Sequence, residues 1–346
     1  MKLSSRRSRE RFGRNTTSPP TLLLSMNKDL TKMVFRVRRK TKVMESLMNK
    51  HVFVTGGSSG IGYEIAKRAL IQGASVTIVA RNKARLAAAK ESLLKECVCS
   101  PTQIVAEELD VGDFAATKRV IEQASRWRPI DVLVCNAGLV RSGLFGECRA
   151  EDIDQVVRTN LLGCAYSVHA ALPHMKQEQS KSSHGKSIVL IGSLAGMYTL
   201  YGANIYAATK YALRGLAETL RLELLPHNIR VSLICPGFTD TALLGDATTD
   251  QQVLETLKSV CHYDPRDTES PADVAARTVE AIKAGEYIVA TRRVGGVLVM
   301  LSRGLLPSES IVTTLLECVF FVPVRLLSVL VLLNVRRLLG RSSNSK

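Results

Sequence analysis

Residues 51–72, HVFVTGGSSGIGYEIAKRALIQ, join a short β-rich run to a helical pattern through a turn that contains four glycines. The run HVFVT at 51–55 predicts a strand, and residues 63–72 predict a helix. Gly56 permits a tight turn, Gly60 lets the backbone approach a phosphate, and Gly62 lets the helix pack close to the sheet. Turns use glycine for their own geometry, so the glycines alone are weak evidence. Their place between a strand and a helix is typical of a site where a helix N-terminus binds a pyrophosphate. We assign to this site Gly56, Ser58, Ser59, Gly60, Ile61 and Gly62.

Further β-rich runs follow along the chain: 75-SVTIVA, 103-QIVAEEL, 131-DVLVC, 187-SIVLIG, 229-IRVSLI and 286-EYIVAT. Segments rich in Ala, Leu, Glu and Lys, such as 82–96 and 114–127, separate the earlier runs and predict helices. Most runs are almost continuously apolar, as expected of strands covered on both faces. The alternation predicts the α/β class, with a single doubly wound parallel sheet of about seven strands. Residues 239–271 interrupt the pattern near the end of a late strand, where an insertion can cover a ligand.

Charge is unevenly distributed along the 346 residues. The formal net charge is +16, and residues 1–50 alone hold 14 Lys or Arg against three acids, Glu10, Asp29 and Glu45. This distribution predicts a basic leader (1–50) that is disordered or directs targeting, a catalytic domain (51–295) and a hydrophobic C-terminal segment (296–346). A nucleic-acid-binding domain would carry its basic residues on the folded part, so we expect no nucleic-acid partner.

The eight cysteines contain no C-x-x-C pair, and the six histidines do not combine with them at zinc spacing. Cys135, Cys164 and Cys235 lie inside apolar runs, which is typical of small buried residues. We therefore expect reduced thiols and no metal site.

The end of the second predicted strand indicates which dinucleotide is bound. An enzyme that uses NAD usually has Asp or Glu there, to bind the ribose 2′-hydroxyl. This chain has Arg81, with Lys83 and Arg85 nearby, and a guanidinium suits a 2′-phosphate. The alternative is a solvated charge at a helix start, but the missing acid favours NADPH. The ends of the third and fourth strands add small or acidic residues that could meet the cofactor: Asp110, Val111, Asn136, Ala137 and Gly138.

Tyr206 and Lys210 are four residues apart, so they lie on one face of a predicted helix, and Ser193 ends the strand before it. Reducing a ketone with hydride requires a proton donor at the developing alkoxide. Tyrosine has a pKa near 10, which an adjacent Lys210 ammonium would lower, and Ser193 would donate a second hydrogen bond to the substrate oxygen. The spacing alone is poor evidence, because Tyr63 and Lys67 repeat it without a serine 13 residues earlier.

Together these motifs resemble those of the short-chain dehydrogenase/reductase family over about residues 50–293, which implies a Rossmann-type fold. The glycine signature of the family matches 55-TGGSSGIG, its Asn-Ala-Gly matches 136–138, and its Pro-Gly element matches Pro236-Gly237. The resemblance implies that Asn160, Ser193, Tyr206 and Lys210 are catalytic. It also implies that Lys210 holds the nicotinamide ribose and that Asn160 holds a water in a proton relay. Cofactor contacts are implied for Tyr206, Lys210, Pro236, Gly237, Thr239 and Thr241.

Within the family, the chain is most similar to reductases of 3-ketodihydrosphingosine. The stretches 76-VTIVARN, 201-YGANIYAATKYALRGLAETLRLEL and 237-GFTDT carry this likeness, with the apolar tail. It implies NADPH-dependent reduction of a lipid ketone in sphingolipid biosynthesis, at the cytosolic face of the endoplasmic reticulum membrane. One alternative is another membrane-bound lipid, steroid or 3-ketoacyl-thioester reductase, because substrate choice depends on residues 239–270 and the tail. A second is a non-catalytic dinucleotide-sensing scaffold, which would usually lack Tyr206 or Lys210. The basic leader, where such reductases often have a hydrophobic segment, leaves import into another organelle open.

The C-terminal segment is strongly apolar. Its uncharged stretches, Cys318–Val324 and Leu326–Val335, are each shorter than the roughly 20 residues that a spanning helix needs. Arg336, Arg337 and Arg341 follow. We expect a segment that associates with a membrane surface or enters the bilayer without a clear span. The alternative is a buried helix or an oligomer interface, and a homo-oligomer stays open.

Overall fold

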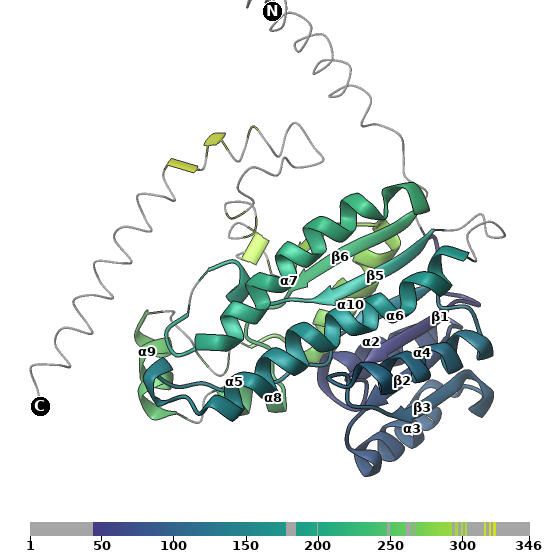
Figure 1. Ribbon diagram of the computed structural model, residues 1–346, viewed down its shortest axis with the longest axis horizontal. Helices are drawn as coiled ribbons and strands as arrows, with labels where there is room; N and C mark the ends of the chain where they lie inside the picture. The colour runs from purple at the N-terminus through teal and green to yellow at the C-terminus, as the bar shows by residue number, and fades with distance from the viewer. Residues whose placement is uncertain are drawn as a thin grey trace, which may run out of the picture. The chain divides into compact units, whose positions relative to one another are not determined.

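The structure, a computed structural model, describes residues 44–177, 185–198, 200–247, 250–260, 264, 266 and 268–292, and single residues between 295 and 322 (Figure 1). Its centre is a parallel seven-stranded sheet in the order β3-β2-β1-β4-β5-β6-β7. The strands are β1 (His51–Thr55), β2 (Ser75–Ala80), β3 (Ile104–Glu108), β4 (Val132–Cys135), β5 (Lys186–Ile191), β6 (Ile229–Cys235) and β7 (Ile288–Ala290). The predicted fold, a single doubly wound parallel sheet, is confirmed.

The strand order reverses between β1 and β4, which are direct neighbours although helices and two other strands separate them in the chain. The register brings Val54 opposite Val134 and Ile191 opposite Ile234, so the carboxyl ends of β1, β4, β5 and β6 lie close to one level. In open α/β sheets, ligands bind at such a point, outside the carboxyl ends of the strands.

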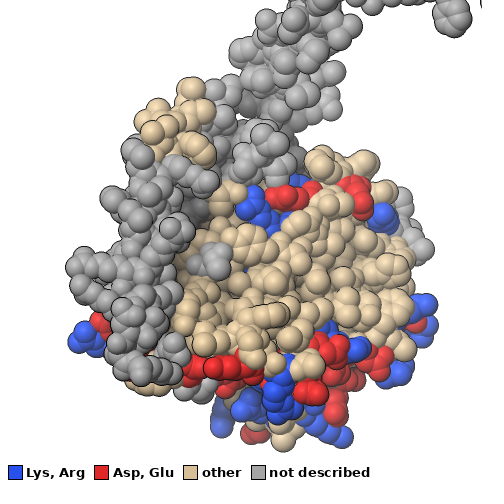
Figure 2. Space-filling model, turned by 60° about the vertical axis from the view of Figure 1, so that its left-hand side comes forward, with Lys and Arg blue, Asp and Glu red and all other residues tan. Residues whose placement is uncertain are grey.

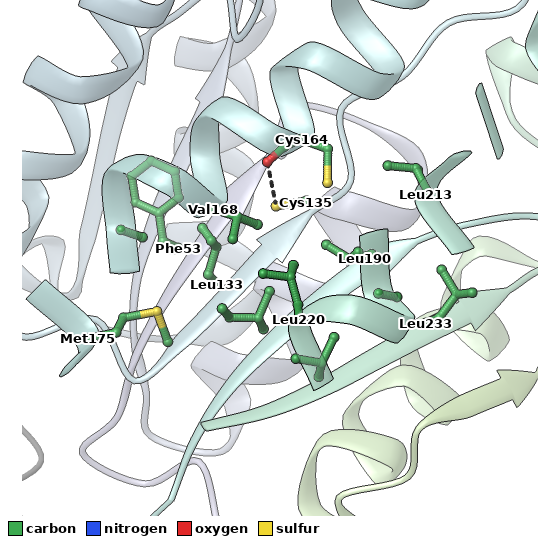
Figure 3. Packing of buried hydrophobic residues seen from close by; sticks show 14 of the residues in the cluster. Phe53, Leu133, Cys135, Cys164, Val168, Met175, Leu190, Leu213, Leu220 and Leu233 are labelled. Carbon is green, nitrogen blue, oxygen red and sulfur yellow. Dashed lines mark hydrogen bonds between the residues drawn. The ribbon is translucent and has the colours of Figure 1, made fainter. Parts of the chain in front are cut away.

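Helices cover both faces of the sheet (Figure 1). One layer consists of α2 (Gly60–Ile71), α3 (Lys83–Cys97) and α10 (Pro271–Ala284), and the other of α4 (Phe114–Trp127), α6 (Gly163–Gln177) and α7 (Asn204–Glu223). The two-residue alternation of the strands divides the core, because Val52 and Val54 pack in the first layer and Phe53 in the second. Figure 3 shows this second layer, where Phe53, Leu133, Met175 and Leu220 fill the space between sheet and helices.

Shorter elements surround the carboxyl ends of the strands. Helix α5 (Ala150–Val157) continues through a π-helical turn, η3 (Arg158–Leu162), into α6. Helices α8 (Ala242–Ala247) and α9 (Gln251–Val260) form within the predicted interruption after β6. The 3₁₀ turns η2 (Phe145–Glu147) and η5 (Leu194–Gly196) also follow strands, whereas η1 (Pro101–Gln103) and η6 (Leu225–His227) precede β3 and β6 at the opposite end of the sheet.

The packed body includes residues on both sides of 51–295. Met44 and Leu47 are buried in the core beside α2, and the Asn49 N–H donates to the Gly73 carbonyl. At the other end Val299 is buried in the core of the second layer, and the Ser302 hydroxyl contacts the Met197 sulfur at 3.3 Å. Withdrawing these apolar side chains from water fastens both segments to the sheet domain. Residues 1–43 of the predicted leader lie outside the described residues.

No helix within the described parts of the chain is long and apolar enough to cross a membrane. Beyond Ser302, the structure describes four large apolar residues of the tail. All of them are exposed: Leu315, Val319, Phe321 and Val322. The stretch Leu326–Val335 and the three arginines after it lie outside the described residues. In the same described parts, the seven cysteines form no disulfide and no cluster of potential metal ligands occurs.

Candidate active site

A cavity of about 590 Å³ opens at the carboxyl ends of the strands. Every residue assigned to the site from the sequence lines this cavity, except Gly62, Asp110 and Asn160. The structure therefore brings together segments that follow β1, β2, β3, β4, β5 and β6 in the chain.

The glycine turn after β1 lines one side of the cavity. Gly56 has φ +65°, and a Cβ there would lie 2.9 Å from Ala137 Cα, so a side chain would be both strained and crowded. The Asn136 amide donates to the carbonyls of Thr55 and Gly56, at 3.0 Å each. Asn136 thus ties the glycine turn to β4, a contact that its position after the strand did not reveal. Gly62 lies behind the turn, where a Cβ would overlap the Gly56 carbonyl oxygen and the Asn136 amide.

The N-terminus of α2 fits a phosphate group. Gly60, at φ +56°, and Ile61 line the cavity at the start of this helix. No side chain caps α2, whereas Asn82, Asp113 and Ser270 cap α3, α4 and α10. Free N–H groups and the positive end of the helix dipole favour an anion at such a terminus. The cradle therefore fits the pyrophosphate of a dinucleotide.

Arg81 and Arg85 line the cavity beyond the glycine turn. Asn82, between them in the chain, accepts the Arg85 N–H at 2.9 Å and so starts α3 at this point. Both guanidinium groups are exposed, and neither forms an ion pair with another described residue. They are therefore available to bind a phosphate.

The acid at the end of β3 is placed differently from the prediction. Asp110 is exposed, and its carboxylate accepts the Gly112 N–H at 2.9 Å. Val111 is the residue of this pair that lines the cavity. Asp110 thus stabilises the turn after β3, and an adenine contact by its side chain stays a prediction.

Tyr206 and Lys210 lie on one face of α7, and the Lys210 ammonium is 5.5 Å from the centre of the Tyr206 ring. Lys210 is buried and donates to the Ile191 carbonyl, at the end of β5, over 2.8 Å. Ser193 follows this strand, and its Oγ accepts the Ala195 N–H at 3.1 Å. This bond uses a lone pair of Oγ and not its proton, and the same hydroxyl forms a hydrogen bond with Tyr206.

Burial determines the titration of this pair. It raises the pKa of Tyr206, and a hydrogen bond with Ser193 only partly opposes that rise. The lowering of the Tyr206 pKa expected from Lys210 is not found, because Lys210, with a lowered pKa, has lost its charge in the pH range where Tyr206 titrates. Burial also lowers the pKa of Lys210 to about 8, against opposing effects of Cys164 and Cys235.

Asn160 is buried within the π-helical turn η3 and does not line the cavity. Its Oδ1 accepts the Leu139 N–H at 2.8 Å, and its Nδ2 donates to the Leu139 carbonyl and to Thr209 Oγ1. Both amide protons are thus in use, and the side chain holds the segment after β4 against α7. Its role in holding a water stays a prediction.

The sequence analysis missed most of the apolar wall of the cavity. Six apolar residues line it: Val140, Leu200, Phe238, Leu243, Leu244 and Val253. Val253 of α9 is 2% exposed and packs with Leu200, Phe238, Leu244 and Leu254 in a small separate core. Only the long interruption before the last helix signalled that this region would cover a ligand, because these residues come from segments with no common motif.

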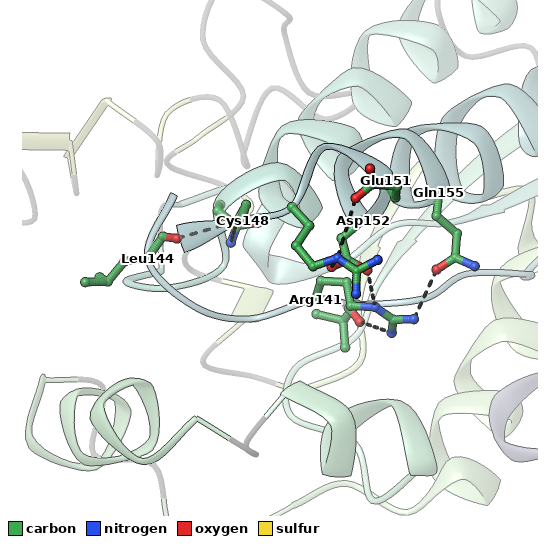
Figure 4. Close-up of polar contacts among 9 residues, drawn as sticks. Arg141, Leu144, Cys148, Glu151, Asp152 and Gln155 are labelled. Carbon is green, nitrogen blue, oxygen red and sulfur yellow. Dashed lines mark hydrogen bonds and ion pairs between the residues drawn. The ribbon is translucent and has the colours of Figure 1, made fainter. Parts of the chain in front are cut away.

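The segment after β4 forms the side of this wall and is held by a polar network (Figure 4). Arg141 lies between two side chains of α5, donating to Asp152 at 3.2 Å and to Gln155 at 3.0 Å. The Gly143 N–H donates to the Gly202 carbonyl, close to the start of α7. Between them, Ser142 lines the cavity, and its buried hydroxyl has no hydrogen-bond partner among the described residues. A buried hydroxyl in this state is suited to a polar group of a ligand.

Known proteins share this sequence and this arrangement. The model of the short chain dehydrogenase family matches residues 50–252. A 3-dehydrosphinganine reductase of Arabidopsis thaliana is 33% identical over 279 residues, which cover 81% of this chain and 81% of that protein. A 3-ketodihydrosphingosine reductase of Bos taurus is 33% identical over 282 residues, covering 79% and 80%. Among solved structures, a short-chain dehydrogenase from Sphingobium yanoikuyae in complex with NADPH superposes with a TM-score of 0.60 at 28% identity, covering 70% of this chain and 88% of that one.

The family match spans more than half of the chain and includes the glycine turn, Ser193, Tyr206 and Lys210. The resemblance inferred from the motifs is thereby confirmed, and the chain belongs to the short-chain dehydrogenase/reductase family.

Proposed function

We propose that this chain uses NADPH to reduce the ketone of a long-chain sphingoid base, 3-ketodihydrosphingosine, to the alcohol. One observation carries the proposal. Ser193, Tyr206 and Lys210 meet at a cavity with a phosphate cradle on one side and an apolar wall on the other. The names of relatives at 33% identity over about four fifths of the chain support the same substrate.

NADPH, when bound, supplies the hydride that reaches the ketone carbon. The chain's own residues then manage one proton and one developing negative charge. Tyr206 gives its phenol proton to the alkoxide oxygen, and Ser193 donates a hydrogen bond to the same oxygen. The raised pKa of Tyr206 keeps this phenol protonated at neutral pH, as a proton donor for reduction must be. Lys210 keeps a positive charge near the phenol while the proton leaves.

The choice of NADPH rests on Arg81 and Arg85. Both line the cavity beyond the glycine turn, and the end of β2 carries no acid that would repel a 2′-phosphate. The NADPH in the related Sphingobium yanoikuyae structure is consistent with this choice.

A lipid substrate fits the apolar wall. Six aliphatic or aromatic side chains from four segments converge there, and Val253 closes the wall from α9. Each methylene that leaves water for such a surface contributes about 0.8 kcal/mol, so a long alkyl chain is strongly favoured over a short one. Ser142 offers a hydrogen bond to a polar group of the substrate.

We further propose that the C-terminal segment brings the enzyme to the endoplasmic reticulum membrane, with the catalytic domain in the cytosol. A sphingoid ketone dissolves in bilayers, so an enzyme at the surface meets more of it. Exposed apolar residues such as Leu315 and Phe321 support this placement. Figure 2 shows a broad area without Lys, Arg, Asp or Glu side chains between two clusters of charged ones. Targeting by the basic leader, residues 1–50, to another organelle stays an alternative.

The test is a substrate panel with the full chain in detergent, following NADPH oxidation. The panel contains 3-ketodihydrosphingosine, a 3-ketoacyl-CoA and a steroid ketone. We expect the highest kcat/KM with the sphingoid ketone. A higher value with either of the others would assign the enzyme to the corresponding branch, and no oxidation with any of the three would favour a dinucleotide-sensing scaffold.

The membrane proposal has a separate test. A chain that ends at residue 310 keeps Val299 and Ser302, which pack on the body, and loses the apolar stretches after them. We expect this chain to leave the membrane fraction and to keep activity on a short ketone. Continued sedimentation with membranes would contradict the role of the tail.

A further inference from the structure

The peptide bond between Pro236 and Gly237 is held from both sides. Its carbonyl, on Pro236, accepts the Leu194 N–H at 2.9 Å. Its N–H, on Gly237, donates to the Glu269 carboxylate at 3.3 Å. Leu194 directly follows Ser193, so one rigid peptide plane links the Glu269 carboxylate to the segment that carries the catalytic serine.

Glu269 is a charged side chain in a buried place. It is 5% exposed, and its Oε1 lies 3.7 Å from Nε of Arg292, whose side chain is 40% exposed. A buried carboxylate is costly unless a partner and hydrogen bonds compensate it, and here Arg292 and the Gly237 N–H do so. A Cβ on Gly237 would lie only 3.1 Å from this Oε1, so the absence of a side chain permits the close approach.

The backbone of Glu269 holds the neighbouring residues independently of its side chain. Its N–H donates to the Phe238 carbonyl at 2.8 Å, and its carbonyl accepts the Asp240 N–H at 2.9 Å. The bridge between Thr239 and Glu269 belongs to the same pairing. A substitution at 269 therefore leaves these contacts in place, and the contact it removes from the cavity wall is the one at Gly237.

We propose that Glu269 is a positioning residue. Its carboxylate fixes the Pro236–Gly237 peptide and, through Leu194, the direction of the Ser193 hydroxyl, while Arg292 compensates the buried charge. The inference rests on the proposed reduction, because Glu269 acts through a residue of that reaction. It goes beyond that reaction, because it assigns a role to Glu269 and Arg292, which do not touch the reacting atoms.

Four variants test the proposal: Glu269→Leu, Glu269→Gln, Arg292→Gln and the double variant of the last two. Steady-state kinetics gives kcat and KM for the ketone, and NADPH fluorescence gives the cofactor Kd. We expect Glu269→Leu to lower kcat about tenfold and to change the NADPH Kd by less than about twofold, because one hydrogen bond to a charged group is lost on the serine side only. Glu269→Gln should restore kcat to within about threefold, since its amide oxygen still accepts the Gly237 N–H.

Arg292→Gln removes the positive charge beside the Glu269 carboxylate, and we expect a lower kcat that the double variant partly recovers, because the amide that replaces the Glu269 carboxylate carries no charge. This recovery is informative even if Glu269→Leu does not fold. The matched control is Glu286→Gln. It breaks the Arg277–Glu286 ion pair, whose nitrogen and oxygen are 2.6 Å apart and whose residues do not line the cavity. It should lower the thermal midpoint without changing kcat.

Three outcomes would overturn the inference: an unchanged kcat in Glu269→Leu, a loss of NADPH affinity as large as the loss of kcat, or a double variant no better than Arg292→Gln. The activity of the wild type on the ketone panel distinguishes these three outcomes from a failure of the proposed function. A wild type that reduces none of the ketones refutes both, whereas an active wild type with an unaffected Glu269→Leu refutes only the role of Glu269.

Discussion

The two sides of the cavity are built in different ways. The cofactor side consists mainly of backbone: the glycine turn, the uncapped start of α2 and the small residues after β4, which follow β1 and β4 directly. The substrate side consists of side chains from four segments, the residues after β4, the approach to α7, the residues after β6, and α8 with α9.

This difference shows how each side acquires its specificity. A backbone cradle needs glycine at defined positions, and the sequence therefore records it as a local motif. A side-chain wall needs apolar surface of the right shape, and many residue combinations provide it. A single substitution on the cofactor side should therefore have a large effect on the kinetic constants, whereas a single substitution on the substrate side should have a small one.

The largest effect is expected where the two sides meet, at the proton donor. Tyr206→Phe should lower kcat by roughly 10²-fold or more, because positioned acid catalysis is lost, and should leave the NADPH Kd nearly unchanged. Steady-state rates and fluorescence titration measure the two quantities. Tyr63, which has a lysine at the same spacing, provides the control: its hydroxyl bonds to Glu96 on the surface, and Tyr63→Phe should keep kcat. Activity of Tyr206→Phe above about a tenth of wild type would contradict the assignment.

The next effect concerns the cofactor side alone. Arg81→Asp should lower kcat/KM for NADPH by roughly 10–100-fold relative to NADH, since a charge-assisted bond to the 2′-phosphate is lost and repulsion replaces it. Kinetics with both cofactors measures the ratio. Lys83→Asp introduces the same charge change at a residue that does not line the cavity, and should alter the ratio much less. An unchanged ratio in Arg81→Asp would mean that another residue binds the 2′-phosphate.

The third effect is a pH dependence that arises from Lys210, where the two sides of the cavity meet. Below its pKa of about 8 Lys210 is charged, and above it the charge is lost, so kcat/KM for reduction should fall as pH rises through about 8. The decrease should approach roughly tenfold for each further pH unit. Tyr206 has a raised pKa and does not lose its proton in this range. In Lys210→Arg the guanidinium stays charged, so whatever activity remains should not show this fall. A flat wild-type profile up to about pH 9.5 would contradict a titrating Lys210.

The smallest effect is expected on the substrate side. Val253→Ala removes two methyl groups and should raise KM for a long-chain ketone by about fourfold or more, fourfold being the contribution of one buried methylene, and should leave a short water-soluble ketone nearly unaffected. Comparing the two substrates in one assay makes each the control of the other. Val98→Ala, at a residue that is 92% exposed, should change neither value. An equal rise of KM for both ketones would mean that Val253 stabilises the fold and does not contact the substrate.

By itself, the sequence determined the α/β class, the parallel sheet and the position of the cofactor turn, and it predicted Ser193, Tyr206 and Lys210 as the catalytic residues. These features depend on local patterns: strands and helices have their own periodicity, and a phosphate turn needs glycine at fixed spacing. Only the tertiary structure placed Met44 and Val299 in the core, turned the Asn160 amide toward Leu139, and set the Lys210 ammonium against Ile191. It also brought Glu269 to Gly237, over 32 residues of chain. Such contacts depend on how segments distant in sequence pack together, and burial, which raises the Tyr206 pKa and lowers that of Lys210, exists only once that packing is complete.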